Sequence, residues 1–405
     1  MSDRATPDPA ADLRAAFLRH VCQTSPEPLA LEVARAAGAT VWDTHGRAYL
    51  DLLSGIGVAN VGHAHPAVVR AVQEQAARYL HVMVYGEAIE APQVELARRL
   101  AELAPGELDV TFFTNSGAEA VEGALKTARK FTGRDGFVAF EGGFHGDTFG
   151  ALSVGGNPVY RRPFEPLLPG VRWLPFDDQE ALRQIDDSIA AVIIEPVQGE
   201  GGVRIPHPEF LPALRRRCTE VGALLVFDEV ITGFGRTGKL FAAEHWSVTP
   251  DLLVLAKALG GGMPLGAFVG RAEIMATLSR DPPLAHVTTF GGHPVSCAAG
   301  LAALDVLLQG RLTERARQLG QQWTTHLAGC VGKRLRAVRG KGLLIGLEFA
   351  DPDSTRRFAR TCFANGLILN WTLHLDTVIR LAPPLVLTEE ESARALAILG
   401  AALAA

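Results

Sequence analysis

Short apolar runs follow one another through the middle of the chain, and segments with helical spacing of apolar residues separate them. The runs are Val110–Thr114, Phe137–Phe140, Val171–Leu174, Ala190–Ile194, Ala223–Phe227 and Leu252–Leu255. A strand that is apolar along its whole length is buried on both faces, which is typical of a parallel sheet covered by helices. The sequence therefore predicts an α/β fold in which ligands bind beyond the carboxyl ends of the strands.

Two of these runs end in residues that carry chemistry. Leu252–Leu255 leads to Lys257, which three glycines follow at positions 260–262, and Ala223–Phe227 leads to Asp228. An amine at a strand end, beside glycines that let another molecule approach the backbone, suits a Schiff base. A carboxylate at another strand end can keep a proton on a pyridine nitrogen, so that the ring accepts electrons. Lysine and aspartate are the two protein groups that pyridoxal phosphate needs.

The composition is that of an ordinary globular protein. The chain has 405 residues, of which 48% are hydrophobic and 20% are charged, and its net charge is -5. This charge balance does not indicate a nucleic acid or an anionic membrane as a partner, and no apolar run is long enough to span a bilayer. The five cysteines are scattered and odd in number, which favours a reduced, cytoplasmic location. His63 and His65 lack a supporting Cys, Asp or Glu cluster, so we expect no metal site.

The pattern of elements changes along the chain. Residues 66–304 hold the alternating strands and helices and are expected to form the large cofactor-binding domain. Residues 305–405 read as a smaller α+β domain with its own core, and residues 1–65 are expected to pack with it.

Several glycine-rich polar segments follow the other predicted strands. The turn at residues 115–118 opens a helix whose N–H groups could bind phosphate, with Ser116 adding a hydroxyl, although a plain N-cap is the commoner role. Phe144 could stack on a planar ring or simply pack. Arg236 reads as a surface charge or as a charge that ties a loop. Two segments remain. Glu195–Gly202 contains two carboxylates, and Thr288–Pro294 contains two hydroxyls.

In combination and order these segments resemble the class III (ω-) aminotransferases of pyridoxal-phosphate fold type I. The resemblance runs from about residue 28 to the C-terminus. It implies an aspartate-aminotransferase-like fold, with a mainly parallel seven-stranded sheet and a smaller α+β domain. Its most specific stretches are 115–120, 195–200, 228–238, 255–262 and 288–292.

The resemblance also implies roles for individual residues. Lys257 is expected to form the Schiff base and Asp228 to pair with the pyridine nitrogen. Glu200 and Arg380 resemble the family's gating pair, in which the arginine grips the carboxylate of 2-oxoglutarate and the glutamate masks it. Thr289 resembles a threonine that reaches the partner's cofactor phosphate, so the active unit is expected to be a homodimer with shared sites. The other expected contacts are Ser116, Gly117, Ala118, Phe144 and His145 for the cofactor and Tyr85 for the substrate.

Two positions depart from the family pattern. Ile231 stands where many members have a glutamine that bonds the ring hydroxyl. Asp147 stands where acetylornithine and ornithine aminotransferases carry an arginine for the donor's carboxylate. An aspartate repels a carboxylate and favours a second ammonium, as in putrescine, unless it is only a solvated loop charge.

Together these expectations predict that the protein is a transaminase. The terminal amino group of a diamine or ω-amino acid would pass to 2-oxoglutarate or pyruvate, with a putrescine-like donor first and an acetylornithine- or ornithine-like donor next. Other pyridoxal chemistry on the same fold, as in an aminomutase, racemase or decarboxylase, stays open. A non-catalytic binding protein is less consistent with the pair Lys257 and Asp228.

Overall fold

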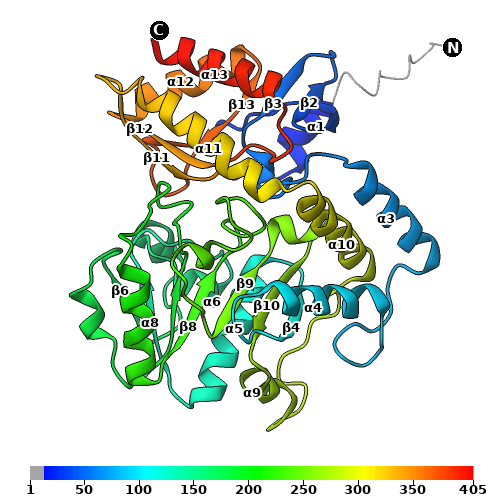
Figure 1. The fold of residues 1–405 in the computed structure, drawn as a ribbon, viewed down its shortest axis with the longest axis vertical. Helices are drawn as coiled ribbons and strands as arrows, with labels where there is room; N and C mark the ends of the chain where they lie inside the picture. Colours follow the sequence, from blue (N-terminus) through cyan, green and yellow to red (C-terminus); the bar gives the residue numbers. More distant parts are fainter. Residues whose placement is uncertain (1–12, 405) are drawn as a thin grey trace, which may run out of the picture.

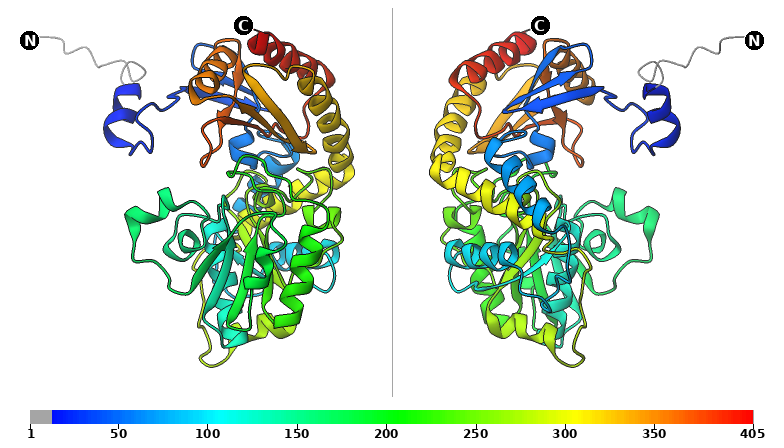
Figure 2. Two further views of the ribbon diagram at one scale, coloured as in Figure 1. Left: turned by 90° about the vertical axis from the view of Figure 1, so that its left-hand side faces the viewer. Right: turned by 90° about the vertical axis from the view of Figure 1, so that its right-hand side faces the viewer.

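The computed structural model describes residues 13–404. Figure 1 shows a larger lower part, which holds one sheet between layers of helices, and a smaller upper part, which is built from both ends of the chain. The helix α1 (Leu13–His20) stands away from the upper part in Figure 2, and none of its residues is buried.

The sheet of the lower part has seven strands in the order β4-β10-β9-β8-β7-β5-β6. Strands β5 to β9 run parallel, whereas β10 runs antiparallel to β4 and β9. The prediction of a mainly parallel seven-stranded α/β sheet is therefore confirmed, and β10 is the strand that the apolar runs did not single out. The bounds are Val110–Thr114 (β4), Gly136–Phe140 (β5), Val171–Leu174 (β6), Ile189–Ile194 (β7), Leu224–Asp228 (β8), Leu252–Leu255 (β9) and Gly266–Gly270 (β10).

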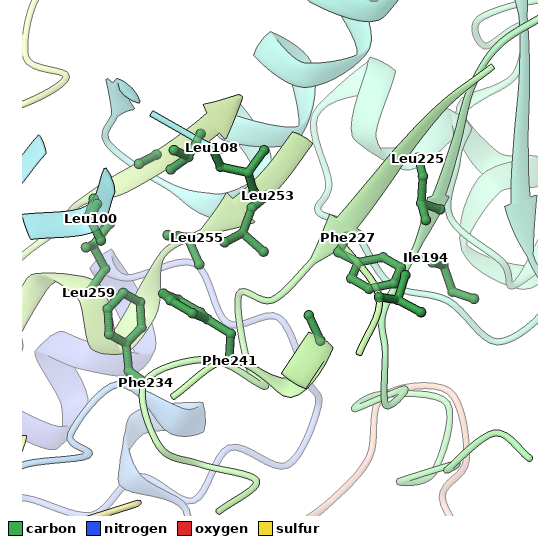
Figure 3. Close-up of a cluster of buried hydrophobic side chains, with 14 of the residues drawn as sticks. Leu100, Leu108, Ile194, Leu225, Phe227, Phe234, Phe241, Leu253, Leu255 and Leu259 are labelled. Carbon is green, nitrogen blue, oxygen red and sulfur yellow. The ribbon is translucent and has the colours of Figure 1, made fainter. Parts of the chain in front are cut away.

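Neighbouring side chains of the central strands point to opposite faces of this sheet, and both faces are buried. Val192 and Leu225 belong to a hydrophobic cluster on one face, whereas Ile193 and Val226 belong to a cluster on the other. Figure 3 shows part of the first cluster, with side chains of β8 and β9 among those of the surrounding helices and loops. Burial on both faces explains why these strands are continuously apolar instead of alternating.

Helices cover both faces of the large sheet. One face packs against α5 (Gly117–Thr132), α6 (Phe149–Ser153) and α9 (Ala272–Met275). The other packs against α4 (Ala91–Leu103), α8 (Phe210–Val221) and α10 (Pro294–Gln309), and α3 (Pro66–Arg78) lies on α10. Short helices occupy Ser54–Gly57 (α2) and Pro158–Arg161 (α7).

The upper part contains two four-stranded sheets. One has the order β1-β2-β3-β13 and the other β11-β12-β15-β14. The strands are Val33–Ala37 (β1), Thr40–Asp43 (β2), Ala48–Asp51 (β3), Leu335–Lys341 (β11), Leu344–Phe349 (β12), Leu367–Ile368 (β13), Asn370–Trp371 (β14) and Val378–Leu381 (β15). The helices are α11 (Leu312–Ala328), α12 (Pro352–Ala364) and α13 (Glu389–Ala404).

The pairing of β3 with β13 joins the beginning of the chain to its end. A strand from the first 65 residues thus lies in one sheet with a strand from the last hundred residues, and the division into an N-terminal segment, a large domain and a C-terminal domain stays a prediction. The helix α10 continues without a break across the expected boundary at residue 304 to Gln309.

Among residues 13–404, no single helix is long and apolar enough to cross a membrane. The helices α10 and α11 together pass that test by length and composition, but they are bent by 63° at the break between them. Their apolar faces include many buried residues, as expected for core helices.

Candidate active site

A cavity of about 750 Å³ opens at the carboxyl ends of the parallel strands. Residues that follow β4, β5, β7, β8 and β9 line it, so the polar segments that are far apart in sequence meet there. This is the position where ligands bind in α/β sheets. No group of three or more potential metal ligands occurs in the described part of the chain.

Lys257 lines this cavity directly after β9. It begins the short 3₁₀ turn Lys257–Gly260 and has a φ of 51°, in the left-handed region. Burial lowers the pKa of its amine, and the nearby charge of Arg380 lowers it further, against the carboxylates of Glu200 and Asp228. A depressed pKa leaves more of the amine neutral, which is the form that attacks a carbonyl carbon.

Asp228 ends β8 on the same wall of the cavity. Its Oδ2 lies 2.7 Å from Nδ1 of His145, and its Oδ1 accepts the N–H of Val230 at 3.0 Å. Both the aspartate and the histidine are buried. The carboxylate is thus held in one orientation by a ring and a backbone group, while one side of it still lines the cavity.

The first turn of α5 also lines the cavity. Ser116 is the N-cap, and its Oγ accepts the N–H of Glu119 at 3.2 Å. Gly117 and Ala118 follow in the first turn, where N–H groups have no partner inside the helix. A Cβ at Gly117 would lie 3.0 Å from a methyl group of Val230, so the close approach of these two segments favours glycine. Ser116 therefore acts as an N-cap, and the N-terminus of α5 also lines the cavity.

Glu195 joins two of the loops that line the cavity. Its carboxylate accepts the N–H of Phe144 at 3.0 Å and the N–H of Gly199 at 2.8 Å. Burial raises the pKa of Glu195 to about 7, His145 opposes this rise, and the negative charge of Asp228 adds to it. This bridge fixes the loop after β5 to the loop after β7.

Glu200 forms a buried ion pair with Arg380 of β15. Glu200 lines the cavity, and Arg380 is not among the lining residues. Burial by itself would raise the pKa of Glu200, but the guanidinium of Arg380 holds it below its usual range. The Nε of Arg380 is buried and has no partner among the described residues. The arginine therefore stands behind the glutamate and has unused hydrogen-bonding capacity.

The structure does not bring every expected residue into this cavity. Thr289 is exposed, and its carbonyl oxygen lies 2.7 Å from Nε2 of His81. Tyr85 is half-buried and does not line the cavity. Asp147 lines the rim and is exposed, and the structure gives it no hydrogen bond or ion pair with another described residue. Neither Thr289 nor Tyr85 therefore lines the cavity of its own chain.

Arg236 lies outside the cavity and is fully buried. Its guanidinium donates to the carbonyl oxygens of Leu343 at 3.1 Å and Pro383 at 2.6 Å, and to Oδ1 of Asn60 at 2.6 Å. These contacts confirm that it ties a loop of the large domain to both ends of the chain.

The turn between β14 and β15 carries no sequence motif that indicates a role at the site. Leu373 and His374 of this turn contact Glu200, and Tyr160 contacts Leu373. No motif marks these residues, because the turn reaches Glu200 only through the pairing of strands far along the chain.

The residues of the cavity fit pyridoxal phosphate. An amine with a lowered pKa, an oriented carboxylate and a helix N-terminus match the aldehyde, the pyridine nitrogen and the phosphate of this cofactor. Ile231 lines the cavity and cannot bond the ring hydroxyl, as its side chain has no polar atom.

Comparison with known proteins agrees with this fit. The family model described as aminotransferase class III matches residues 21–403. An acetylornithine aminotransferase of Methanopyrus kandleri is 49% identical over 371 residues, which cover 91% of this chain and 93% of that protein.

Solved structures agree as well. The ornithine aminotransferase of Toxoplasma gondii is 33% identical with a TM-score of 0.90, and the match covers 97% of this chain and 94% of that one. A further structure of that enzyme reports pyridoxal phosphate at the active site. An (S)-enantioselective ω-transaminase of Thermomicrobium roseum is 33% identical with a TM-score of 0.91, covering 99% of both chains. The chain belongs to the class III aminotransferase family and is a pyridoxal-phosphate-dependent transaminase.

Proposed function

We propose that this enzyme transfers the terminal amino group of an ω-amino donor to 2-oxoglutarate, with pyruvate as the other acceptor. The observation that carries the proposal is that Glu200 covers Arg380 beside Lys257. An arginine that can be covered and uncovered allows one site to take two different substrates in turn. The cofactor supplies an electron sink that stabilises negative charge at the substrate carbon.

Lys257 and Asp228 have separate tasks in this proposal. Lys257 would hold the cofactor's aldehyde carbon at rest and, once released, would take a proton from the substrate carbon and return it, as a general base and acid. Asp228 would keep a proton on the pyridine nitrogen. His145, at 2.7 Å, holds the Asp228 carboxylate in place for that role. The turn of Ser116, Gly117 and Ala118 would bind the phosphate, and Phe144 would stack on the ring.

Arg380 would bind the carboxylate of the acceptor. Its free Nε and its charge suit a carboxylate, and Glu200 must leave for that contact to form. When the donor carries no carboxylate at this point, Glu200 stays and neutralises the arginine. The pair thus distinguishes the donor from the acceptor by charge.

Asp147 supports a diamine such as putrescine as the donor. It lies exposed on the cavity rim, where a second ammonium could meet it and a carboxylate would be repelled. A second candidate is an acetylornithine-like donor, which the 49% identical relative favours by its name. In that case a cation other than an arginine at position 147 must hold the donor's carboxylate.

We propose a homodimer with shared active sites as the working unit. The rings of His81 and Phe290 lie together, with centroids 4.9 Å apart, and Thr289 is exposed. The segments around these two rings expose large apolar side chains, namely Leu80, Val82, Met83, Ile89, Leu284, Val287 and Phe290. Such a patch suits burial against a second copy, where Thr289 and Tyr85 could reach the partner's cavity. We also propose a cytoplasmic location, in keeping with the free cysteines.

The test is the visible absorption of the purified holoenzyme with an amine and no oxo acid. A change with putrescine alone supports the diamine, and a change with N-acetylornithine alone supports the second candidate. Turnover that does not depend on an added oxo acid would contradict transamination and indicate a mutase, racemase or decarboxylase. Lys257→Ala is expected to abolish turnover. A protein that shows no cofactor band even with added pyridoxal phosphate would point to a binding protein instead.

A further inference from the structure

The Glu200 carboxylate is held by two groups that belong to one hairpin. One oxygen pairs with Arg380 of β15, and the other accepts the N–H of Leu373 at 2.7 Å. Leu373 lies in the turn that connects β14 to β15. The carbonyl of Glu200 also accepts the N–H of His374 at 3.2 Å. The turn therefore holds Glu200 in the position that covers Arg380.

The same turn is fixed from its other side by the large domain. The hydroxyl of Tyr160 donates to the carbonyl of Leu373 at 2.7 Å. Nδ1 of His374 lies 3.1 Å from the carbonyl oxygen of Gly142. The centroid of the His374 ring lies 5.3 Å from that of Tyr160, with an angle of 31° between the ring planes. It lies 6.0 Å from the centroid of Phe144, with an angle of 73°. One residue, Leu373, thus links Tyr160 through its C=O and Glu200 through its N–H.

We propose that Tyr160 and His374 are positioning residues that hold the turn at Leu373 against Glu200 and so favour the covered state of Arg380. This inference rests on the proposed roles of Glu200 and Arg380 and adds a device that sets their balance. When a carboxylate takes Arg380, Glu200 loses that partner and must swing away from the N–H of Leu373. A firmly held turn raises the cost of that movement. It therefore weakens binding of the oxo acid and protects the site for the amine.

A conservative variant separates this role from a structural one. Tyr160→Phe removes the hydroxyl and leaves the ring against His374. The two half-reactions are measured apart in single turnovers of the holoenzyme, one with the amine that the wild type accepts and one with 2-oxoglutarate on the aminated enzyme. We expect the apparent Kd for 2-oxoglutarate to fall roughly 2- to 10-fold, the effect of one net hydrogen bond. The maximal rate constants of both steps should stay the same, and the Kd for the amine should stay or rise.

Two further variants make the result decisive. His374→Gln releases the turn at its second anchor and should shift the Kd for 2-oxoglutarate in the same direction. Tyr49→Phe is the matched control, because Tyr49 donates to Asp43 at 3.3 Å in the N-terminal sheet, away from the cavity. It should change neither half-reaction. Equal losses in both half-reactions, an unchanged Kd for the oxo acid, or a higher one would each overturn the proposal.

Arg380→Gln distinguishes the failure of this inference from that of the proposed function. If Arg380→Gln leaves binding of 2-oxoglutarate unchanged, Arg380 is not the acceptor site and the proposed function itself fails. If Arg380→Gln weakens that binding while Tyr160→Phe has no effect, the acceptor site stands and only the role of the turn is rejected.

Discussion

Nδ1 of His145 lies 2.7 Å from Oδ2 of Asp228, and both side chains are buried at the base of the cavity. The histidine follows β5 and the aspartate ends β8, so the contact joins two strand ends across β7. It leaves the orientation of the Asp228 carboxylate little freedom before any ligand arrives.

His145→Ala is expected to weaken cofactor binding by about 10- to 100-fold. A hydrogen bond to a charged group contributes about 1.5–3 kcal/mol, and the variant leaves the buried Asp228 with one partner fewer. The measurement is a titration of the apoenzyme with pyridoxal phosphate, followed by absorbance. His326→Ala, at an exposed position of α11, is the control and should bind normally. An unchanged affinity in His145→Ala would show that the pair does not orient Asp228 for the cofactor.

Arg236→Met is expected to destabilise the fold by about 3 kcal/mol or more. The arginine is fully buried, and its loss leaves two carbonyls and the Asn60 side chain without their donor. Urea unfolding of the two proteins measures the difference. Arg183→Met serves as comparison, because Arg183 is exposed and pairs with Glu180 one turn away, a contact worth at most about 1 kcal/mol. Equal stability of the two variants would contradict the tying role of Arg236.

Glu229 is expected to make the enzyme less stable as the pH rises through neutrality. Burial raises the pKa of Glu229 to about 7 from the ordinary 4.5. The folded state therefore binds more protons than the unfolded state between these two values. The stability that Glu229 contributes is fully present below pH 4.5. It is lost as the pH rises through 7, which lowers the free energy of unfolding by up to about 3 kcal/mol.

The variant Glu229→Gln isolates this effect, since an amide does not titrate. We expect the difference in unfolding free energy between the wild type and the variant to move in favour of the variant from pH 5 to pH 8. At acid pH the variant is expected to be less stable than the wild type. Its amide cannot accept all three hydrogen bonds that Thr232, Ala242 and Ala243 donate to Glu229. A pH-independent difference would mean that Glu229 is ionised throughout that range.

Gly123→Ala is expected to destabilise α5 although alanine favours helices. A Cβ at Gly123 would lie 2.3 Å from the ring of Phe268, which packs there from β10. Overpacking costs about 1–3 kcal/mol, which exceeds the gain in helix propensity of about 1 kcal/mol. Gly400→Ala in α13 meets no atom within 4 Å and should stabilise instead. Thermal unfolding of both variants should show shifts of opposite sign, and a higher Tm for Gly123→Ala would contradict this packing.

The class of fold could be predicted because the relevant information is local. The continuous apolar runs ending near Ile194, Asp228 and Leu255 are strands buried on both faces, as the hydrophobic clusters confirm. The antiparallel strand β10 escaped prediction, because its sequence Gly-Ala-Phe-Val-Gly is short, rich in glycine and close to the lysine motif.

The center of the site could be predicted for the same reason. Lys257 and Asp228 directly follow or end apolar strands, and the carboxyl ends of parallel strands meet at one edge of a sheet. Ser116 could be placed at a helix start from its neighbours. The site contacts of Thr289 and Tyr85 stay predictions, because both lie outside the cavity of their own chain.

The sequence by itself determined the α/β class, the strand ends and the chemistry that Lys257 and Asp228 can perform. Only the tertiary structure decided that Arg380 stands behind Glu200, and that the turn at Leu373 holds this glutamate from a hairpin of the small domain. The physical reason is the range of the interactions. Periodicity and strand-end chemistry depend on a few neighbouring residues, whereas these contacts join positions more than 170 residues apart. They exist only because β15 pairs with β12 and β14 above the edge of the large sheet.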